Sequence, residues 1–200
     1  MQYHSVGSEE YQATSEQLSE GEVAQLIEHL TDGLALLTGG RFTSFSSVTV
    51  ERPASGQKVN TLRTGSIVVG RYRGVKSIGN TIGLGRWSTD GDTAEISGGA
   101  IYLDQNFDRS SEARRLLRIH ELGHALGYLH VTTRTSIMNP AIGPEPTQFD
   151  RDAALIAFER MPGNQSPDTD GGDAPRSRGG IFGVRGLART VWAPTVICMP

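Results

Sequence analysis

The sequence predicts a single domain of the α/β (α+β) class, in which short strands and three helices share one core. Its 200 residues are enough for one hydrophobic core of ordinary size. Apolar residues recur at helical spacing in three segments of the chain. Between the first and second of these segments, runs rich in β-branched and aromatic residues alternate with glycine, which is typical of strands joined by turns.

The first helix is predicted to begin at Ser19, because Ser19 and Glu22 have the spacing of a capping box. Six apolar residues follow at helical spacing: Val23, Leu26, Ile27, Leu30, Leu34 and Leu37. Gly39 and Gly40 then end the helix. Residues 1–17 are polar and lack apolar periodicity, so we expect a flexible lead-in before a domain that spans residues 18–162.

The strands are predicted from short β-branched runs that are bounded by glycine or proline. A Gly98-Gly99 pair separates the last two of these runs, and we expect it to form a turn. The expected strand regions are residues 41–53, 66–71, 81–84, 93–97 and 100–103.

Two further helices are predicted after the strands. The first spans Ser110–Leu126, with Asp108, Ser110 and Ser111 as candidate caps. The second spans Thr147–Arg160 and begins with another capping pattern, "TQFD". Residues 163–200 are expected to be a disordered linker and tail, since the linker is rich in Gly, Asp, Ser and Pro and the tail shows no clear period.

The composition excludes several classes of protein. A net charge of −3 lacks the basic excess of a nucleic-acid binder. The sequence contains no phosphate-binding glycine motif and no nucleophile elbow. It has no apolar run long enough to span a bilayer, and no signal peptide is visible. The lone Cys198 rules out an internal disulfide and a cysteine-based zinc site, so any metal would need histidine ligands.

The segment "HELGHALGYLH" holds three of the five histidines and predicts a metal site. His120 and His124 are four residues apart, so on a helix both imidazoles lie on one face and can bind one zinc ion. Glu121 is rotated by one position, toward the place where a zinc-bound water would lie. Gly127 can adopt the positive φ that ends a helix, and the turn would return His130 as third ligand.

A pair of histidines four apart on a helix is more often a surface or core feature than a metal site. We interpret the other two histidines, His4 and His29, in that way. Here the glycine and the third histidine also have the required offsets, within a segment predicted independently as a helix followed by a turn. The combination favours a metal site.

This motif resembles the H-E-x-x-H-x-x-G-x-x-H signature of metzincin zinc peptidases. The methionine turn of that family is also matched, because "TSIMNP" places Met138 eight residues after His130. Pro140, two residues later, makes the chain most similar to the matrixins. The resemblance covers Ser19–Arg160 in element order. It implies a metzincin-like (zincin) fold: a twisted, mostly parallel sheet with one antiparallel edge strand, two long helices and a C-terminal helix.

The resemblance also implies a function, a zinc metalloendopeptidase with one catalytic Zn²⁺ held by His120, His124 and His130. Glu121 would activate the zinc-bound water, and Met138 would lie beneath the imidazoles. The substrate is expected to be a peptide or protein, bound as an extended strand along an edge strand. The residues expected to contact the substrate are Gly99, Ala100, Ile101 and Tyr102 in that strand, and Pro140 and Ile142 in the loop after the methionine turn.

Two other functions remain open at this point. One is a catalytically silent zinc-binding module that recognises peptides, although such a module would not need Glu121. The other is a zinc hydrolase of a non-protein amide, which the two-histidine motif alone also permits. The resemblance further implies a secreted or extracellular monomer. Asp90 and Asp92 offer oxygen atoms for Ca²⁺, but their sequence favours an exposed turn over a calcium site.

Overall fold

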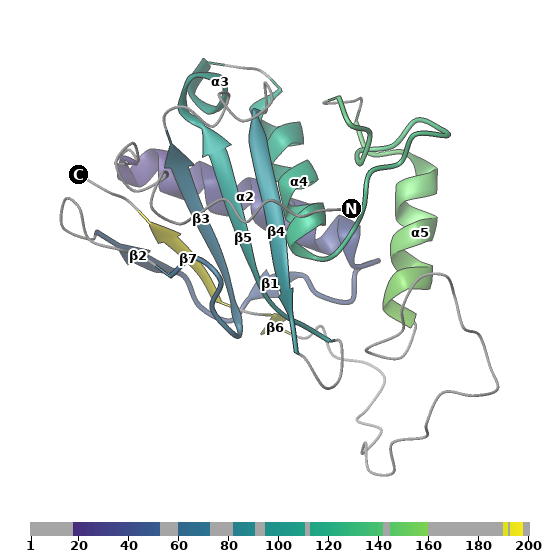
Figure 1. The fold of residues 1–200 in the computed structure, drawn as a ribbon, viewed down its shortest axis with the longest axis horizontal. Coiled ribbons are helices and arrows are strands. Elements are labelled where there is room, and N and C mark those ends of the chain that lie inside the picture. Colours follow the sequence, from purple (N-terminus) through teal and green to yellow (C-terminus); the bar gives the residue numbers. More distant parts are fainter. Residues whose placement is uncertain are drawn as a thin grey trace, which may run out of the picture.

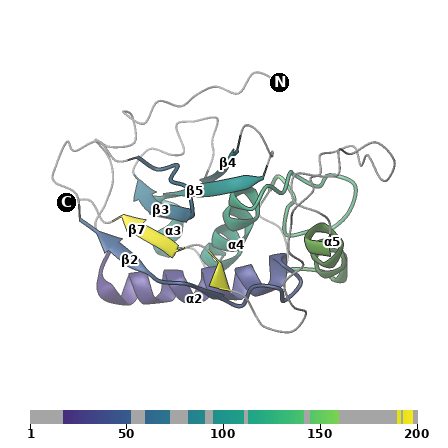
Figure 2. The ribbon, with the colours of Figure 1, turned by 90° about the horizontal axis from the view of Figure 1, so that it is seen from below.

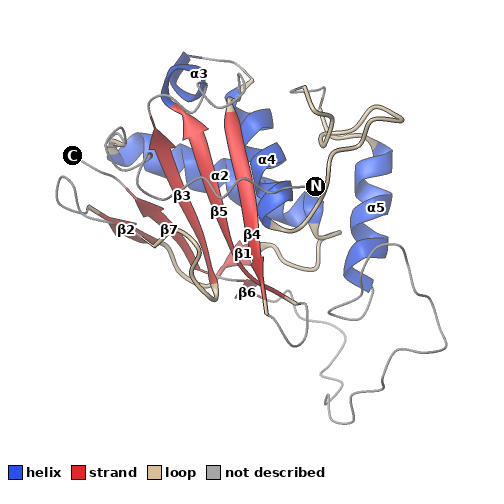
Figure 3. Ribbon diagram, in the orientation of Figure 1, coloured by secondary structure: helices blue, strands red, loops and turns tan. Residues whose placement is uncertain are grey.

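In the computed structural model, one sheet is covered on one face by two long helices (Figures 1 and 3). These helices are α2 (Glu20–Leu37) and α4 (Arg114–Ala125), and a third helix, α5 (Gln148–Glu159), lies to the side of both. Seen from below, α2 runs beneath the sheet, and α4 lies between α2 and the part of the sheet that contains β4 (Figure 2). The structure describes residues 18–52, 60–72, 82–90, 95–110, 113–141, 145–159, 190–191 and 193–197.

The sheet has the strand order β2-β7-β3-β5-β4 and is mostly parallel. Its strands are β2 (Thr49–Glu51), β7 (Ala193–Ile197), β3 (Ser66–Tyr72), β5 (Ile96–Asp104) and β4 (Gly83–Thr89). The pairs β2–β7, β7–β3 and β3–β5 are parallel, whereas β4 runs antiparallel to β5 at the edge. The expected sheet with one antiparallel edge strand is therefore confirmed.

The core forms where the apolar faces of α2 and α4 meet the sheet. Leu26, Leu30 and Leu34 of α2 are fully buried, as the helical spacing predicts. The space between the helices is narrow at Gly33, where a Cβ atom would lie 3.1 Å from side-chain carbons of both Ile119 and Leu122 on α4. Each buried leucine contributes about 1.5–3 kcal/mol of transfer free energy, so this interface holds α4 firmly against the domain.

The first helix begins and ends as predicted. The Ser19 hydroxyl accepts a hydrogen bond from the Glu22 N–H, and the Ser19 N–H donates to the Glu22 carboxylate, which completes the capping box. Gly39 and Gly40 have φ of 59° and 77°. A Cβ at Gly39 would lie 2.8 Å from Leu155 of α5, so the helix end also provides a close contact for the last helix.

The expected turn at Gly98-Gly99 is wrong, because β5 is continuous from Ile96 to Asp104. The glycines are explained by close packing instead of by a turn. A Cβ at Gly98 would lie 2.2 Å from the Arg63 carbonyl oxygen, and one at Gly99 would lie 2.8 Å from the Cβ of Ala125 on α4. The neighbouring strand β4 extends to Thr89, further than the expected 81–84.

The predicted helix Ser110–Leu126 is divided in the structure. A short helix, α3 (Gln105–Ser110), follows β5, and α4 begins later at Arg114. The Asp104 carboxylate accepts hydrogen bonds from the N–H groups of Asn106 and Phe107, so the cap precedes the one expected from sequence. Asp108, a predicted cap, binds two arginines instead. The last helix agrees with its prediction to within one residue at each end.

A buried ion network joins three of these helices to the sheet. The carboxylate of Asp108 on α3 accepts hydrogen bonds from Arg71 of β3 and from Arg118 of α4, at 2.8–2.9 Å. Both guanidinium groups are fully buried, and Arg71 also binds Glu22 of α2 at 2.7 Å. Because Arg118 lies two residues before His120, the network fixes the helix that carries the histidines.

The C-terminal segment differs from the expected tail without regular structure. β7 lies between β2 and β3, and a second short strand, β6 (Thr190–Val191), pairs with β1 (Ser44–Phe45). Without β7, the backbone groups along one side of β3 would be unpaired, which explains why a β-branched segment adds there. Residues 1–17 and the linker from 160 to 189 lie outside the described residues. None of the helices in the described parts is long and apolar enough to cross a membrane.

Candidate metal centre

The last turn of α4 and the loop that follows it place three histidines together. His120 and His124 lie on one face of the helix, as their spacing predicts. Gly127 then adopts a φ of 92°, and the N–H of Tyr128 donates to the Gly123 carbonyl at 2.9 Å, which closes the helix end. A Cβ at Gly127 would lie 2.4 Å from Ile96, so both backbone conformation and space require glycine here.

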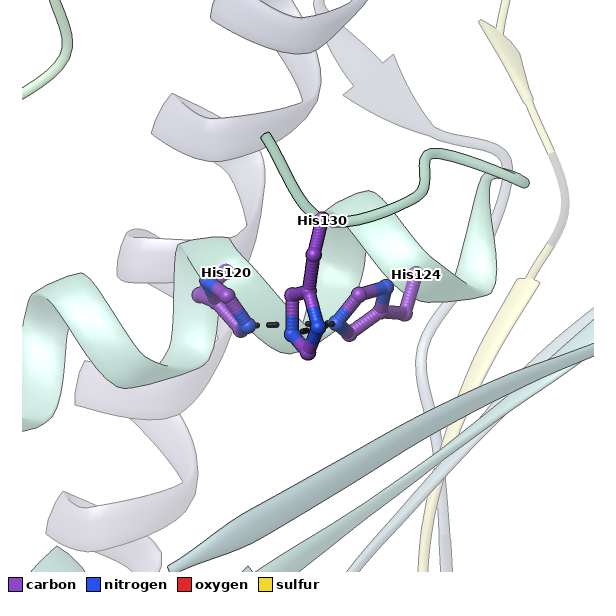
Figure 4. A group of neighbouring side chains, drawn as sticks. All are labelled: His120, His124 and His130. Carbon is purple, nitrogen blue, oxygen red and sulfur yellow. Dashed lines mark hydrogen bonds between the residues drawn. The ribbon is translucent and has the colours of Figure 1, made fainter. Parts of the chain in front are cut away.

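The three imidazoles converge on one point (Figure 4). The Nε2 atom of His124 lies 3.1 Å from the Nε2 of His120 and 3.1 Å from the Nε2 of His130. Two nitrogens bound to one tetrahedral zinc at 2.0–2.1 Å would be about 3.3 Å apart. Within the described residues, these three form the one group of His, Cys, Asp or Glu side chains able to hold a metal ion.

The hydrogen bonds of the other ring nitrogens determine where the protons lie. The Nδ1 of His120 lies 2.7 Å from the carbonyl oxygen of Ile137, and the Nδ1 of His124 lies 2.8 Å from that of Tyr128. A carbonyl oxygen only accepts, so each Nδ1 carries the proton and each neutral ring turns an unprotonated Nε2 toward the other. Facing lone pairs at this distance repel each other unless a cation lies between them, so the donor set fits a metal ion.

Burial favours the neutral rings that a metal requires. Desolvation lowers the pKa of His120 and His130, and lowers the pKa of His124 to about 4. The three side chains are therefore neutral at neutral pH, each with one unprotonated ring nitrogen. A metal ion meets little competition from protons at this site.

Glu121 lies in a nearly dry environment beside the edge strand. Its side chain is buried, its carboxylate accepts a hydrogen bond from the backbone N–H of Gly85, and its Oε2 has no hydrogen-bond partner among the residues that the structure describes. Burial raises the pKa of Glu121 to about 8. An unpaired buried oxygen is costly unless a substrate, water or ion binds it. The carboxylate is suited to accepting and returning a proton near neutral pH.

Two glycines of β4 allow α4 to approach the sheet at this point. A Cβ at Gly83 would lie 2.5 Å from Oε1 of Glu121, and a Cβ at Gly85 would lie 2.3 Å from the Glu121 carbonyl oxygen and 2.5 Å from Cβ of His124. Sequence reasoning missed both residues. The alternation Gly83-Leu84-Gly85 was the available signal, because a glycine inside a strand often marks a close backbone approach.

The predicted methionine turn packs against α4 from the other side. Met138 is buried, and a Cβ at Gly123, one residue before His124, would lie 2.4 Å from the Met138 sulfur. The N–H of Val131 donates to the Met138 carbonyl at 2.8 Å, which joins the turn to the loop that carries His130. Pro140 is exposed, and Ile142 lies outside the described residues.

The expectation that residues 99–102 form the peptide-binding edge is wrong. β5 is paired with β3 on one side and with β4 on the other, so its backbone has no free edge for a peptide. The side chains of Ala100, Ile101 and Tyr102 are buried, and Gly99 packs against Ala125. The edge strand beside the histidines is β4, whose pattern of glycine and polar residues gave a weaker strand signal than β5.

The suggested calcium ligands are not supported by the structure. The backbone N–H of Asp90 donates to the carbonyl oxygen of Glu95 at 2.8 Å, which continues the antiparallel pairing of β4 with β5. Asp92 lies outside the described residues.

Comparison with known families agrees with this geometry. The family model of the matrixins (peptidase M10) matches residues 77–159, less than half of the chain. No curated protein and no solved structure matches the chain significantly. The matched region contains β4, β5, α4, the three histidines, the methionine turn and α5. The segment that carries the three histidines is therefore similar to the matrixin family.

Proposed function

We propose that this protein is a zinc-dependent metalloendopeptidase. The observation that carries the proposal is the convergence of three imidazole Nε2 atoms, two of them from the same helix as the buried Glu121. A structural zinc site has four protein ligands, whereas the described residues supply three here, which is the arrangement of a catalytic site. The matrixin match supports the same class of reaction.

His120, His124 and His130 would hold the metal. Their nitrogen donors and low coordination number suit Zn²⁺ better than the oxygen-preferring Mg²⁺ or Ca²⁺. Zinc bound there supplies a Lewis acid that polarises a carbonyl oxygen and lowers the pKa of water. The carbonyl oxygens of Ile137 and Tyr128 orient two of the three rings through their Nδ1 protons.

Glu121 acts as the general base and proton carrier. It takes a proton from the attacking water and delivers it to the leaving amine. Burial, which raises the pKa of Glu121 to about 8 without metal, supports this role because both protonation states are then accessible near neutral pH. The Gly85 N–H holds the carboxylate on one side, and the buried Oε2, which has no hydrogen bond within the described residues, would be the atom that exchanges the proton.

The peptide binds as an extended strand along the side of β4 that pairs with no other described strand. This strand ends the sheet and packs against the same helix that carries His120 and His124 (Figure 1). Backbone pairing along β4 recognises peptides of many sequences, which favours a peptidase over a hydrolase of small non-protein amides. Pro140 lies just after the methionine turn and would contribute to the wall of the substrate site. By similarity to matrixins, the protein acts outside the cell.

The experiment that tests the proposal is cleavage of casein by the full chain, with and without a chelator, beside the variants Glu121→Ala and Glu28→Ala. We expect cleavage that the chelator abolishes and added zinc restores. Glu121→Ala should lose about 10²–10⁴-fold in rate at equal zinc content, because its proton transfer is lost. Glu28, exposed on α2, is the matched control and should leave the rate unchanged.

Two outcomes would reject the proposal. Cleavage by Glu121→Ala within about tenfold of the parent rate, at equal zinc content, would contradict the assigned base. A parent protein that binds zinc and cleaves no unfolded protein would favour the peptide-recognition module or the amide hydrolase.

A further inference from the structure

The geometry points to Tyr128 as a positioning residue of the metal centre. Its hydrogen bond to the end of α2 fixes the loop that orients two of the three ligands, His124 and His130. This inference rests on the proposed metal site, but it does not depend on which substrate the protein cleaves. Tyr128 itself is not a ligand. It acts through His124 and through the backbone that leads to His130.

Tyr128 connects α2 and the metal centre through its two ends. Its hydroxyl donates a hydrogen bond of 2.7 Å to the carbonyl oxygen of Leu37, the last residue of α2. Its own carbonyl oxygen accepts the Nδ1 proton of His124 at 2.8 Å. The position of the His124 ring is therefore linked, through one residue, to a helix 91 residues earlier in the sequence.

The hydroxyl is well suited to this permanent role. Leu37 O is among the last carbonyls of α2, which lack partners within the helix, so the tyrosine satisfies a group that needs a donor. The ring is partly buried against the hydrophobic core, which restricts its movement.

The third ligand lies between two anchors of the same loop. Tyr128 is bonded to α2, and the N–H of Val131 is bonded to the Met138 carbonyl at 2.8 Å. Leu129 and His130, between these anchors, are exposed to solvent. Packing therefore does little to place His130, and the two anchors determine where its ring can reach. Removing the hydroxyl of Tyr128 should therefore increase the mobility of His130 and of the Tyr128 carbonyl oxygen that orients His124.

The test is the zinc affinity of the variant Tyr128→Phe, measured by competition with a chromophoric chelator on the full metal-free chain. The substitution keeps the ring and removes only the hydroxyl. We expect affinity about tenfold weaker than in the parent, at the lower end of the 10–100-fold typical for residues that orient metal ligands. The visible spectrum of bound Co²⁺ should also change, because the geometry of two ligands is relaxed.

Tyr102→Phe is the matched control. Tyr102 is buried on β5, and its hydroxyl lies 2.5 Å from Thr61 Oγ1. The three histidines lie on other segments, α4 and the loop that follows it. This variant should lose a comparable amount of stability and keep the parent's zinc affinity and Co²⁺ spectrum. Amide hydrogen exchange in residues 127–131 of the metal-free protein should accelerate in Tyr128→Phe and stay unchanged in Tyr102→Phe.

The inference is overturned if Tyr128→Phe binds zinc within about twofold of the parent, or if both variants weaken zinc binding equally. A hydroxyl with only a structural role would lower the unfolding temperature without changing either the affinity or the Co²⁺ spectrum of the folded protein. Casein cleavage is not used here, so an inactive parent that binds zinc would refute the peptidase proposal alone. A parent that binds no zinc would refute both.

Discussion

The backbone N–H of Ile137 donates a hydrogen bond of 3.2 Å to the carboxylate of Asp150. The carbonyl oxygen of the same residue accepts the Nδ1 proton of His120 at 2.7 Å. Asp150 also accepts hydrogen bonds from Ser136 Oγ and from the N–H and hydroxyl of Thr147. The carboxylate therefore caps α5 and holds the methionine turn, and through Ile137 it supports the first metal ligand.

Asp150→Asn should destabilise the protein and weaken zinc binding. In the structure, four hydrogen bonds are donated to the Asp150 carboxylate. The asparagine side chain replaces one accepting oxygen with an NH₂ group, which only donates, so at least one of these bonds is lost. We expect a loss of about 2–3 kcal/mol in the free energy of unfolding, measured with denaturant. Asp152→Asn is the control, because Asp152 is exposed and bonds only to Gln148 among the contacts observed on α5. Equal stability of the two variants would contradict the role given to Asp150.

Gly83→Ala should lower kcat with little loss of zinc. The new Cβ would lie 2.5 Å from Oε1 of Glu121 and 2.9 Å from its Cδ, so the carboxylate must move. A displacement of about 1 Å in a catalytic group can reduce the rate about 10²-fold. Gly99→Ala is the matched control, since its Cβ would strike Ala125 on the same helix, one turn away from Glu121. If Gly99→Ala lowers kcat as much as Gly83→Ala does, the loss comes from displacement of the whole helix α4 and not from the Glu121 carboxylate, which would contradict this prediction.

Asp108→Asn should destabilise the fold strongly. The variant leaves the buried guanidinium groups of Arg71 and Arg118 without their shared anion, and removing one partner of a buried ion pair costs about 3–5 kcal/mol. Glu51→Gln removes the carboxylate of a more exposed pair with Arg63, and there we expect a loss below about 1 kcal/mol. Chemical denaturation of both variants measures the difference. Similar losses would mean that the buried network does not hold α4.

The stability of the protein should fall in acid partly through Glu22. Partial burial raises the pKa of this carboxyl, but hydrogen bonds from Arg71 and Ser19 outweigh that effect and lower the pKa to about 2. Since the folded pKa is below the unfolded value of 4.5, this stabilisation is complete above pH 4.5 and is lost as pH falls toward 2. In the variant Glu22→Gln, the free energy of unfolding should change less with pH between 4.5 and 2 than it does in the parent. An acid limb of unchanged slope would exclude this contribution.

Local patterns in the sequence determined the elements that carry the site. The Ser19–Glu22 capping box, the His120–His124 spacing and the turn at Gly127 all act within a few residues, so the backbone geometry follows directly from the residue order. Local patterns also indicated most of the helices and strands between Glu20 and Glu159, but not the short helix α3 or the strands β6 and β7. The local reasoning was wrong at Gly98-Gly99, because a glycine pair suits a turn and a close contact equally well.

Tertiary structure alone decided which strand is the edge and what holds each ligand. β4 and β5 are both plausible edges in sequence, and only the pairing of β5 with β3 excludes β5. The partners of the ligands come from distant segments: Ile137 for His120, and Leu37, through Tyr128, for His124. Hydrogen bonds between distant segments leave no period in the sequence, because they depend on how whole elements pack. The histidine spacing therefore determined which residues meet. The packing of α2 and β4 against α4, and the bonds of α5 to the methionine turn, determined how they are held.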